Sequence, residues 1–148
     1  MTSQFIDIDG ARLEFLRIPG GVAPPLVFLH EGLGSVAMWR DFPTKVAAAT
    51  GAETVVYSRR GYGRSAQLAR PRTVDYMHHE ARVVLPQLVA SLGLRRPIMV
   101  GHSDGASIAL IAAGSGFAAA GLVLMAPHVF VEDVTVAAIA AAKEAYRT

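Results

Sequence analysis

The sequence predicts an α/β fold in which helices cover both faces of a mostly parallel sheet that follows an antiparallel hairpin. Short apolar runs alternate with segments of helical periodicity, the pattern of a parallel sheet covered by helices. Several runs are continuously apolar, as expected for strands buried on both faces. The 148 residues are 52% hydrophobic, so the chain is long and apolar enough to bury the core of one domain, residues 1–148.

A β-hairpin is expected first. Phe5–Ile8 and Leu13–Leu16 are β-like runs on either side of Asp9-Gly10, and glycine tolerates the positive φ of a tight hairpin turn. Pro19–Gly21 and Pro24-Pro25 are predicted to form a loop. Four buried strands are expected after it, at Leu26–Leu29, Thr54–Tyr57, Ile98–Val100 and Leu122–Met125.

Four helices are predicted between and after these strands, at Met38–Thr50, Thr73–Leu92, Ala106–Ala113 and Val134–Tyr146. Gly51 is expected to end the first helix. Pro86 is expected to kink the second or to end its first part, because proline has no N–H to donate. Glu132 and Asp133 favour the N-terminus of the last helix.

Composition excludes several classes of protein. Without cysteine there is no disulfide, no thiolate metal site and no cysteine nucleophile. The net charge is only +2, and basic residues are scattered among acidic ones, so no nucleic-acid-binding face is expected. Met1–Phe5 has no signal-peptide character, and glycines and serines interrupt the uncharged run between Asp104 and His128. We therefore expect a cytoplasmic protein without a membrane span.

The strongest chemical signal is Gly101-His102-Ser103-Asp104-Gly105, which matches G-x-S-x-G. It lies between the Ile98–Val100 strand and the helix that begins at Ala106. A sharp turn of this kind holds the serine in a strained conformation with its hydroxyl exposed, and the N–H groups that open the helix face the anion formed during attack. The motif predicts a nucleophile at Ser103. An ordinary glycine-rich turn would show the same letters without chemistry.

Two other loops follow predicted strands. In the segment Leu29–Ser35, glycine at position 32 would let the backbone approach a substrate oxygen closely. The glycines and serines of Ser58–Ser65 suit a tight structural loop, in which Arg60 and Arg64 are scaffold or solvated residues.

With these motifs the sequence resembles the α/β-hydrolase fold superfamily over essentially its whole length. The matching segments are the N-terminal hairpin, His30–Gly34, Arg60–Ser65 and Gly101–Gly105. The resemblance implies that Ser103 is the nucleophile and that the backbone N–H groups of Gly32 and Asp104 form the oxyanion hole. We expect no cofactor, and the spacing of the histidines supports no metal site. The sequence departs from the family at Glu31 and Ala106, where the family often has glycine.

The histidines do not complete a catalytic triad. In this fold the acid follows the serine and precedes the histidine, but every acid after the predicted elbow helix follows His128, the one histidine after Ser103. We expect His128 to cap or pack a loop. His30 is expected to order the oxyanion loop, and His102 to point away from the exposed face of the serine. His78 and His79 are adjacent, so they lack the spacing of metal ligands on a helix.

The resemblance also implies further strands. We therefore expect the chain to be an N-terminal portion of such a domain, truncated after the sixth strand. Residues 134–148 would begin the lid, and the catalytic acid and histidine would lie beyond Thr148.

The leading function is that of a serine hydrolase acting on an ester or related acyl bond of a small molecule. Serine at position 103 argues against the dehalogenase and epoxide hydrolase branches, which attack through a carboxylate. Acyl transfer, perhydrolysis and C–C cleavage stay open, as does a non-catalytic binding module. Gly32–Ala37 also fits the dinucleotide pattern G-x-G-x-x-A, but no acid closes the next strand at Tyr57-Ser58. The sequence does not identify the substrate or the oligomeric state.

Purified as these 148 residues, the chain is expected to be inactive and prone to association, because a buried parallel strand would become an unprotected edge. Ester hydrolysis and light scattering measure the two properties. Measurable turnover by the isolated monomer would contradict the expectation.

Overall fold

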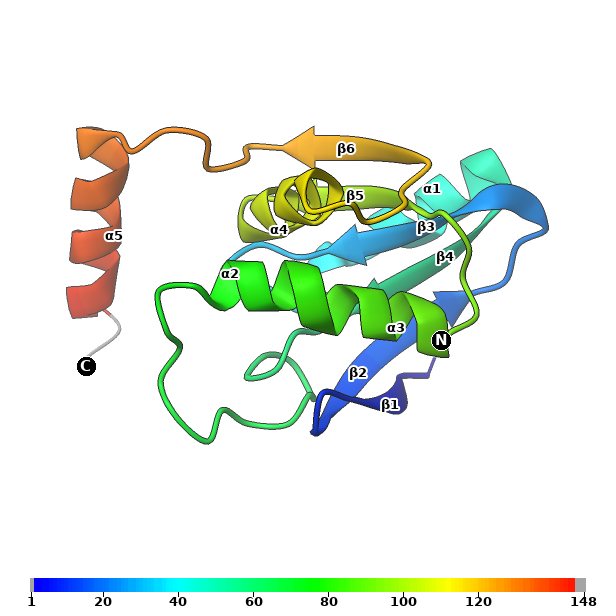
Figure 1. Ribbon diagram of the computed structural model, residues 1–148, viewed down its shortest axis with the longest axis horizontal. Coiled ribbons are helices and arrows are strands. Elements are labelled where there is room, and N and C mark those ends of the chain that lie inside the picture. Colours follow the sequence, from blue (N-terminus) through cyan, green and yellow to red (C-terminus); the bar gives the residue numbers. More distant parts are fainter. Residues whose placement is uncertain (1, 146–148) are drawn as a thin grey trace.

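A six-stranded sheet forms the centre of the computed structural model, which describes residues 2–145 (Figure 1). The strands are β1 (Gln4–Ile8), β2 (Ala11–Ile18), β3 (Val22–Leu29), β4 (Ala52–Tyr57), β5 (Ile98–His102) and β6 (Gly121–Met125). Their order is β1-β2-β4-β3-β5-β6. The pairs β1–β2 and β2–β4 are antiparallel and the other pairs are parallel. The fold class predicted from the sequence is confirmed.

The predicted hairpin is present, with longer strands than expected. Asp9 and Gly10 have φ values of 51° and 67°, the two positive angles that a type I′ turn requires. The turn brings Ile8 opposite Ala11.

The predicted loop at Pro24-Pro25 is wrong, because β3 already begins at Val22 and includes both prolines. Proline cannot donate to a ladder of hydrogen bonds. The register between β3 and β4 shifts between Val22 and Leu26, so the irregularity lies at the prolines. Of the segment predicted to be a loop, Pro19–Gly21 lies outside a strand, and Pro24-Pro25 does not.

Helices cover both faces of the sheet, as predicted. On one face are α2 (Tyr76–His79), the π-helical segment η2 (Glu80–Val84), α3 (Leu85–Ser91) and α4 (Asp104–Gly114). The other face carries the 3₁₀-helix η1 (Val36–Trp39) and α1 (Phe42–Thr50), behind the sheet in Figure 1. Successive residues of β3 divide between the two cores, with Val27 and Leu29 in one and Leu26 and Phe28 in the other.

Two predicted helices are interrupted. The expected helix Met38–Thr50 is divided at Arg40, which has a φ of 52°, although Gly51 ends α1 as predicted. Near Pro86 the irregularity is a π turn, in which the Leu85 N–H donates to the Glu80 carbonyl. Proline at position 86 could not have donated to the Arg82 carbonyl, and the wider turn accommodates its ring.

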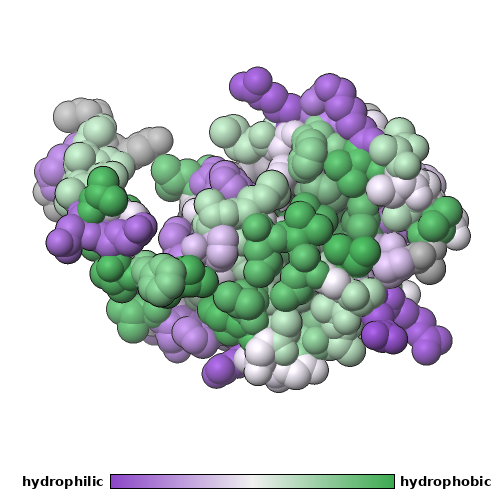
Figure 2. All heavy atoms as spheres, turned by 90° about the horizontal axis from the view of Figure 1, so that it is seen from above, coloured by the Kyte–Doolittle hydropathy of each residue, from purple (hydrophilic) through white to green (hydrophobic). Residues whose placement is uncertain are grey.

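The last strand and helix are the most exposed elements. Among the described residues β6 pairs with β5 alone, and Val123 at its centre keeps 49% of its surface exposed. Figure 2, which looks down on this edge, shows apolar side chains gathered over it. The helix α5 (Asp133–Ala145) buries no side chain and stands apart from the sheet (Figure 1). Tyr146, predicted to belong to it, lies outside the described residues. No helix within residues 2–145 has the length and apolar character to cross a membrane.

A buried carboxylate ties the loop after β4 to the hairpin. In Glu14, Oε1 accepts a hydrogen bond from Ser3 Oγ (2.6 Å), and Oε2 accepts from Ser58 Oγ (3.0 Å) and the Arg64 N–H (2.9 Å). Burial alone would raise the pKa of Glu14, but these hydrogen bonds hold the pKa below its usual value. The structural role expected for the Ser58–Ser65 loop agrees with this network.

Glu14→Gln is expected to lower the free energy of unfolding by about 1–3 kcal/mol near neutral pH, because an amide NH₂ meets donors where an oxygen had accepted. Since folding lowers the pKa of Glu14, its contribution is full above the unfolded pKa and is lost as pH falls through the folded pKa. The deficit should therefore shrink in acid. Urea unfolding measures it. Glu53→Gln, which alters a surface ion pair with Arg17, is the control and should cost less; equal losses in both variants would contradict the prediction.

Candidate active site

Ser103 occupies a strained turn between β5 and α4. Its φ of 52° and ψ of −114° are unfavourable for a residue with a side chain. A Cβ at Gly101 would lie 2.5 Å from the Gly105 carbonyl oxygen. A Cβ at Gly105 would overlap the Leu29 carbonyl and lie 2.7 Å from the His30 carbonyl oxygen. The turn therefore requires both glycines, and the strand–turn–helix context predicted for the motif is present.

The three residues predicted to form the site lie together. Gly105 packs against the end of β3, which brings the following loop to the elbow. A Cβ at Gly32 would lie 3.2 Å from Asp104 Oδ2, so Gly32 borders the first residue of α4. Asp104 is only 8% exposed, and its carboxylate accepts a hydrogen bond from the Tyr76 hydroxyl. Burial and this hydrogen bond raise the pKa of Tyr76.

His30 and Arg59 hold the loop after β3 in place through hydrogen bonds. His30 Nε2 accepts the Arg59 backbone N–H (3.0 Å), so Nδ1 carries the proton and donates to the Glu31 carbonyl (2.6 Å). The buried Arg59 guanidinium donates to the His30 carbonyl (2.5 Å) and the Glu31 carbonyl (2.8 Å). Burial, with the Arg59 charge, lowers the pKa of His30 to about 3. His30 orders the loop as predicted, whereas the role of Arg59 was missed, because the pair Arg59-Arg60 does not show which arginine is buried.

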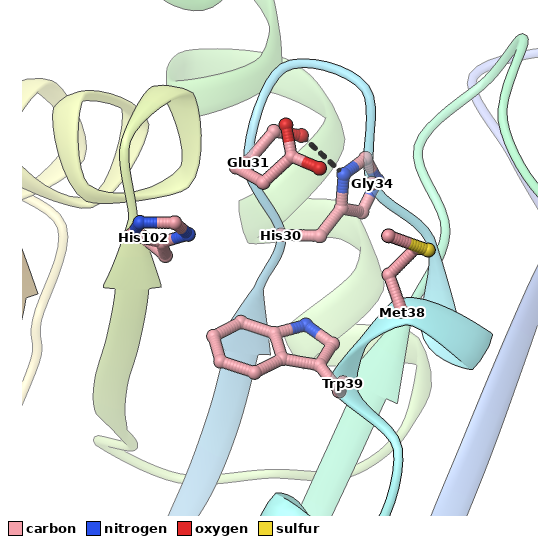
Figure 3. A pocket seen from close by; sticks show the side chains of 6 residues that line it. All are labelled: His30, Glu31, Gly34, Met38, Trp39 and His102. Carbon is pink, nitrogen blue, oxygen red and sulfur yellow. Dashed lines mark hydrogen bonds between the residues drawn. The ribbon is translucent and has the colours of Figure 1, made fainter.

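Two cavities open at the carboxyl ends of the strands. The first, of about 220 Å³, is lined by His30, Glu31, Gly34, Met38, Trp39 and His102. Figure 3 shows His102 at the end of β5 and Trp39 below it. His102 thus faces a different cavity from Ser103, in agreement with its predicted direction.

The second cavity, of about 350 Å³, contains Ser103. Its other walls come from the segment after β6, with the apolar residues Ala126, Pro127, Val129 and Phe130 and the polar residues His128, Glu132 and Thr135. Ser103 Oγ lies 3.3 Å from His128 Nε2. His128 Nδ1 lies 3.3 Å from Ser107 Oγ and 3.7 Å from Asp104 Oδ1.

The expectation that His128 only caps or packs a loop is corrected, since its ring contacts the serine hydroxyl. The order of residues along the chain could not show that the loop after β6 returns to the elbow. Strand pairing explains it, because His102 lies opposite Met125 and the Ser103 N–H donates to the Met125 carbonyl (2.8 Å). The shared carboxyl edge of neighbouring parallel strands was the signal that could have placed His128 here.

The remaining candidates do not join the site. His79 pairs with Asp9 (2.7 Å) beside the hairpin. Throughout residues 2–145 no group of three or more His, Asp or Glu side chains is arranged to hold a metal ion. The dinucleotide pattern at Gly32–Ala37 leads into η1, and α1 begins only at Phe42, so the helix N-terminus that binds a pyrophosphate is not at this loop.

The sheet with its strand–turn–helix elbow defines an α/β hydrolase. The chain belongs to the alpha/beta hydrolase family, whose model matches residues 26–147. It is 35% identical over 85 residues to a non-heme haloperoxidase of Rhodococcus erythropolis, an alignment that spans 57% of this chain and 29% of that protein.

Solved structures show the same fold. The N-formylmaleamic acid deformylase of Pseudomonas putida is 23% identical, with a TM-score of 0.70 over 86% of this chain and 48% of its own. The haloalkane dehalogenase of Agrobacterium tumefaciens is 19% identical, with a TM-score of 0.73 over 94% of this chain and 47% of its own. The chain thus spans less than half of these proteins.

The buried His30 predicts a pH dependence of stability. Below the unfolded pKa of 6.5 the unfolded chain binds a proton that the native state, with a pKa of about 3, does not. As the pH is lowered from 6.5 to about 3, the free energy of unfolding should therefore fall by about 1.4 kcal/mol for each pH unit. Chemical denaturation at a series of pH values measures it. His30→Gln should flatten the slope and His79→Gln should not; an unchanged slope in His30→Gln would refute the assignment.

Proposed function

We propose that the protein is a serine hydrolase acting on an ester or related acyl bond of a small molecule. Ser103 is the nucleophile, and the backbone N–H groups of Gly32 and Asp104 form the oxyanion hole. The observation that carries the proposal is the strained conformation of Ser103, which places its hydroxyl in a cavity open to solvent beside the start of α4. Strain of this kind persists where surrounding packing enforces it, and it concentrates at active sites.

The proposed reaction has two steps. Ser103 Oγ adds to the acyl carbon while a base takes its proton, and the two N–H groups stabilise the negative charge on the former carbonyl oxygen. The tetrahedral intermediate expels the leaving group, which takes the proton from the base. Water then attacks the acyl-enzyme in the same way and releases the acid and Ser103.

The base and its orienting acid are proposed to lie beyond Thr148, as the sequence predicts. His128 is close to Ser103, but within residues 2–145 no carboxylate lies at hydrogen-bonding distance from its Nδ1: Asp104 Oδ1 is 3.7 Å away, and Oδ2 accepts from Tyr76. The similar solved structures are about twice as long, which leaves room for both groups. α5, which buries no side chain, is the proposed start of a lid.

The similar proteins leave the exact reaction open. The likeness to a haloperoxidase, at 35% identity, favours perhydrolysis as the second candidate. Acyl transfer and C–C cleavage use the same nucleophile. Serine rather than aspartate at position 103 favours acyl chemistry over dehalogenation. A cytoplasmic location stays a prediction.

A fluorophosphonate probe tests the nucleophile in the protein expressed from its full reading frame. We expect one labelled residue, identified as Ser103 by peptide mass spectrometry. Ser103→Ala should abolish labelling and lower ester hydrolysis about a thousand-fold or more. The control is Ser115→Ala, at the far end of α4, which should behave as the wild type. Absence of labelling in the wild type would favour a non-catalytic binding module, and labelling that survives Ser103→Ala would exclude Ser103.

A further inference from the structure

The cavity beside Ser103 has one polar side chain next to the reacting oxygen. Its walls combine apolar side chains with polar ones, namely Ala126, Pro127, Val129 and Phe130 with His128, Glu132 and Thr135. Among these polar side chains, His128 reaches Ser103 Oγ. In small-molecule sites a few placed polar groups fix the orientation of the ligand and the specificity of binding.

Ser107 fixes the position of His128. It lies one turn after Ser103 in α4 and is only 5% exposed. Its Oγ accepts the His128 backbone N–H (2.9 Å) and lies 3.3 Å from Nδ1 of the same residue. Two contacts with one buried hydroxyl hold both the backbone and one edge of the ring. Nε2 therefore faces Ser103 in a preset position, 3.3 Å from Oγ.

The surroundings of His128 suit hydrogen bonding better than proton abstraction. Of the described residues, Asp104 is the carboxylate that faces its ring, and it stays beyond hydrogen-bonding distance at 3.7 Å. An imidazolium formed by removing the Ser103 proton would thus lack the hydrogen bond to an acid that stabilises it in a triad. With the base supplied from elsewhere, as proposed above, Nε2 is free to contact the substrate.

We propose that His128 is a specificity-determining residue that hydrogen-bonds a hydroxyl on the carbon next to the acyl carbon, and that the preferred substrates are 2-hydroxy acyl compounds. The inference rests on the proposed function of Ser103. Once Oγ has attacked, such a hydroxyl is three bonds from Oγ, within reach of a nitrogen that now lies 3.3 Å from that atom. A hydroxyl both donates and accepts, so it suits Nε2 in either tautomer. The apolar part of the wall suits a hydrocarbon remainder.

Two esters that differ only in the 2-hydroxyl, ethyl mandelate and ethyl phenylacetate, test the proposal. In the protein expressed from its full reading frame, kcat/KM should favour the mandelate by about 10- to 100-fold, the range for losing a hydrogen bond in an open site. His128→Ala should remove this preference and leave phenylacetate hydrolysis within about three-fold of the wild type. Ser107→Ala should weaken the preference in part, because the ring loses its anchor.

The controls separate the roles of the residues. His102→Ala, which changes the neighbouring histidine that faces the other cavity, should keep the preference. His128→Gln should restore part of it, since an amide also forms hydrogen bonds. A wild type without preference, or a preference that survives His128→Ala, would overturn the proposal. An equal loss of activity on both esters in His128→Ala would also overturn it, because His128 would then be the base. Full activity of Ser103→Ala would instead refute the proposed function, and this inference with it.

Discussion

The close packing of Gly105 against the end of β3 is the constraint on which the site depends. No side chain fits there, since a Cβ would overlap the Leu29 carbonyl. With the glycine in place, the N-terminus of α4 reaches the loop that contains Gly32, and the chain between β5 and α4 must turn through Ser103 at a φ of 52°. The strain on one residue is of order 1–3 kcal/mol. The apolar cores on both sides of the sheet stabilise the arrangement that imposes it.

Buried charged side chains stabilise the loops around this turn. The Arg59 guanidinium donates to two carbonyls of the loop after β3, and its Cζ lies 5.5 Å from the centre of the Tyr62 ring. Burial raises the pKa of Glu80, and the charge of Arg59 opposes that rise. Glu14 performs the corresponding task on the other side of the Ser58–Ser65 loop. These charged side chains thus hold the scaffold around the site.

Local signals made the fold and the turn at Ser103 predictable. Asp9-Gly10 specifies a hairpin turn by itself, and the glycines around Ser103 specify an elbow wherever a strand precedes and a helix follows. What failed depends on distant partners. Pro24-Pro25 belongs to a strand only because β4 pairs with the residues around it. His128 reaches Ser103 only because β6 lies beside β5, a neighbourhood that the chain order does not state.

The end of β5 also explains why two cavities meet at one short motif. Successive residues at a strand end point to opposite sides, so His102 enters the cavity beside Trp39 and Ser103 enters the cavity beside His128. The first cavity is built on the loop after β3 and on η1, and the buried network holds that loop. The second is built on the segment after β6, whose side chains are largely exposed. Residues of that segment can therefore change the shape of the cavity at Ser103 without disturbing the glycine contacts that hold the elbow.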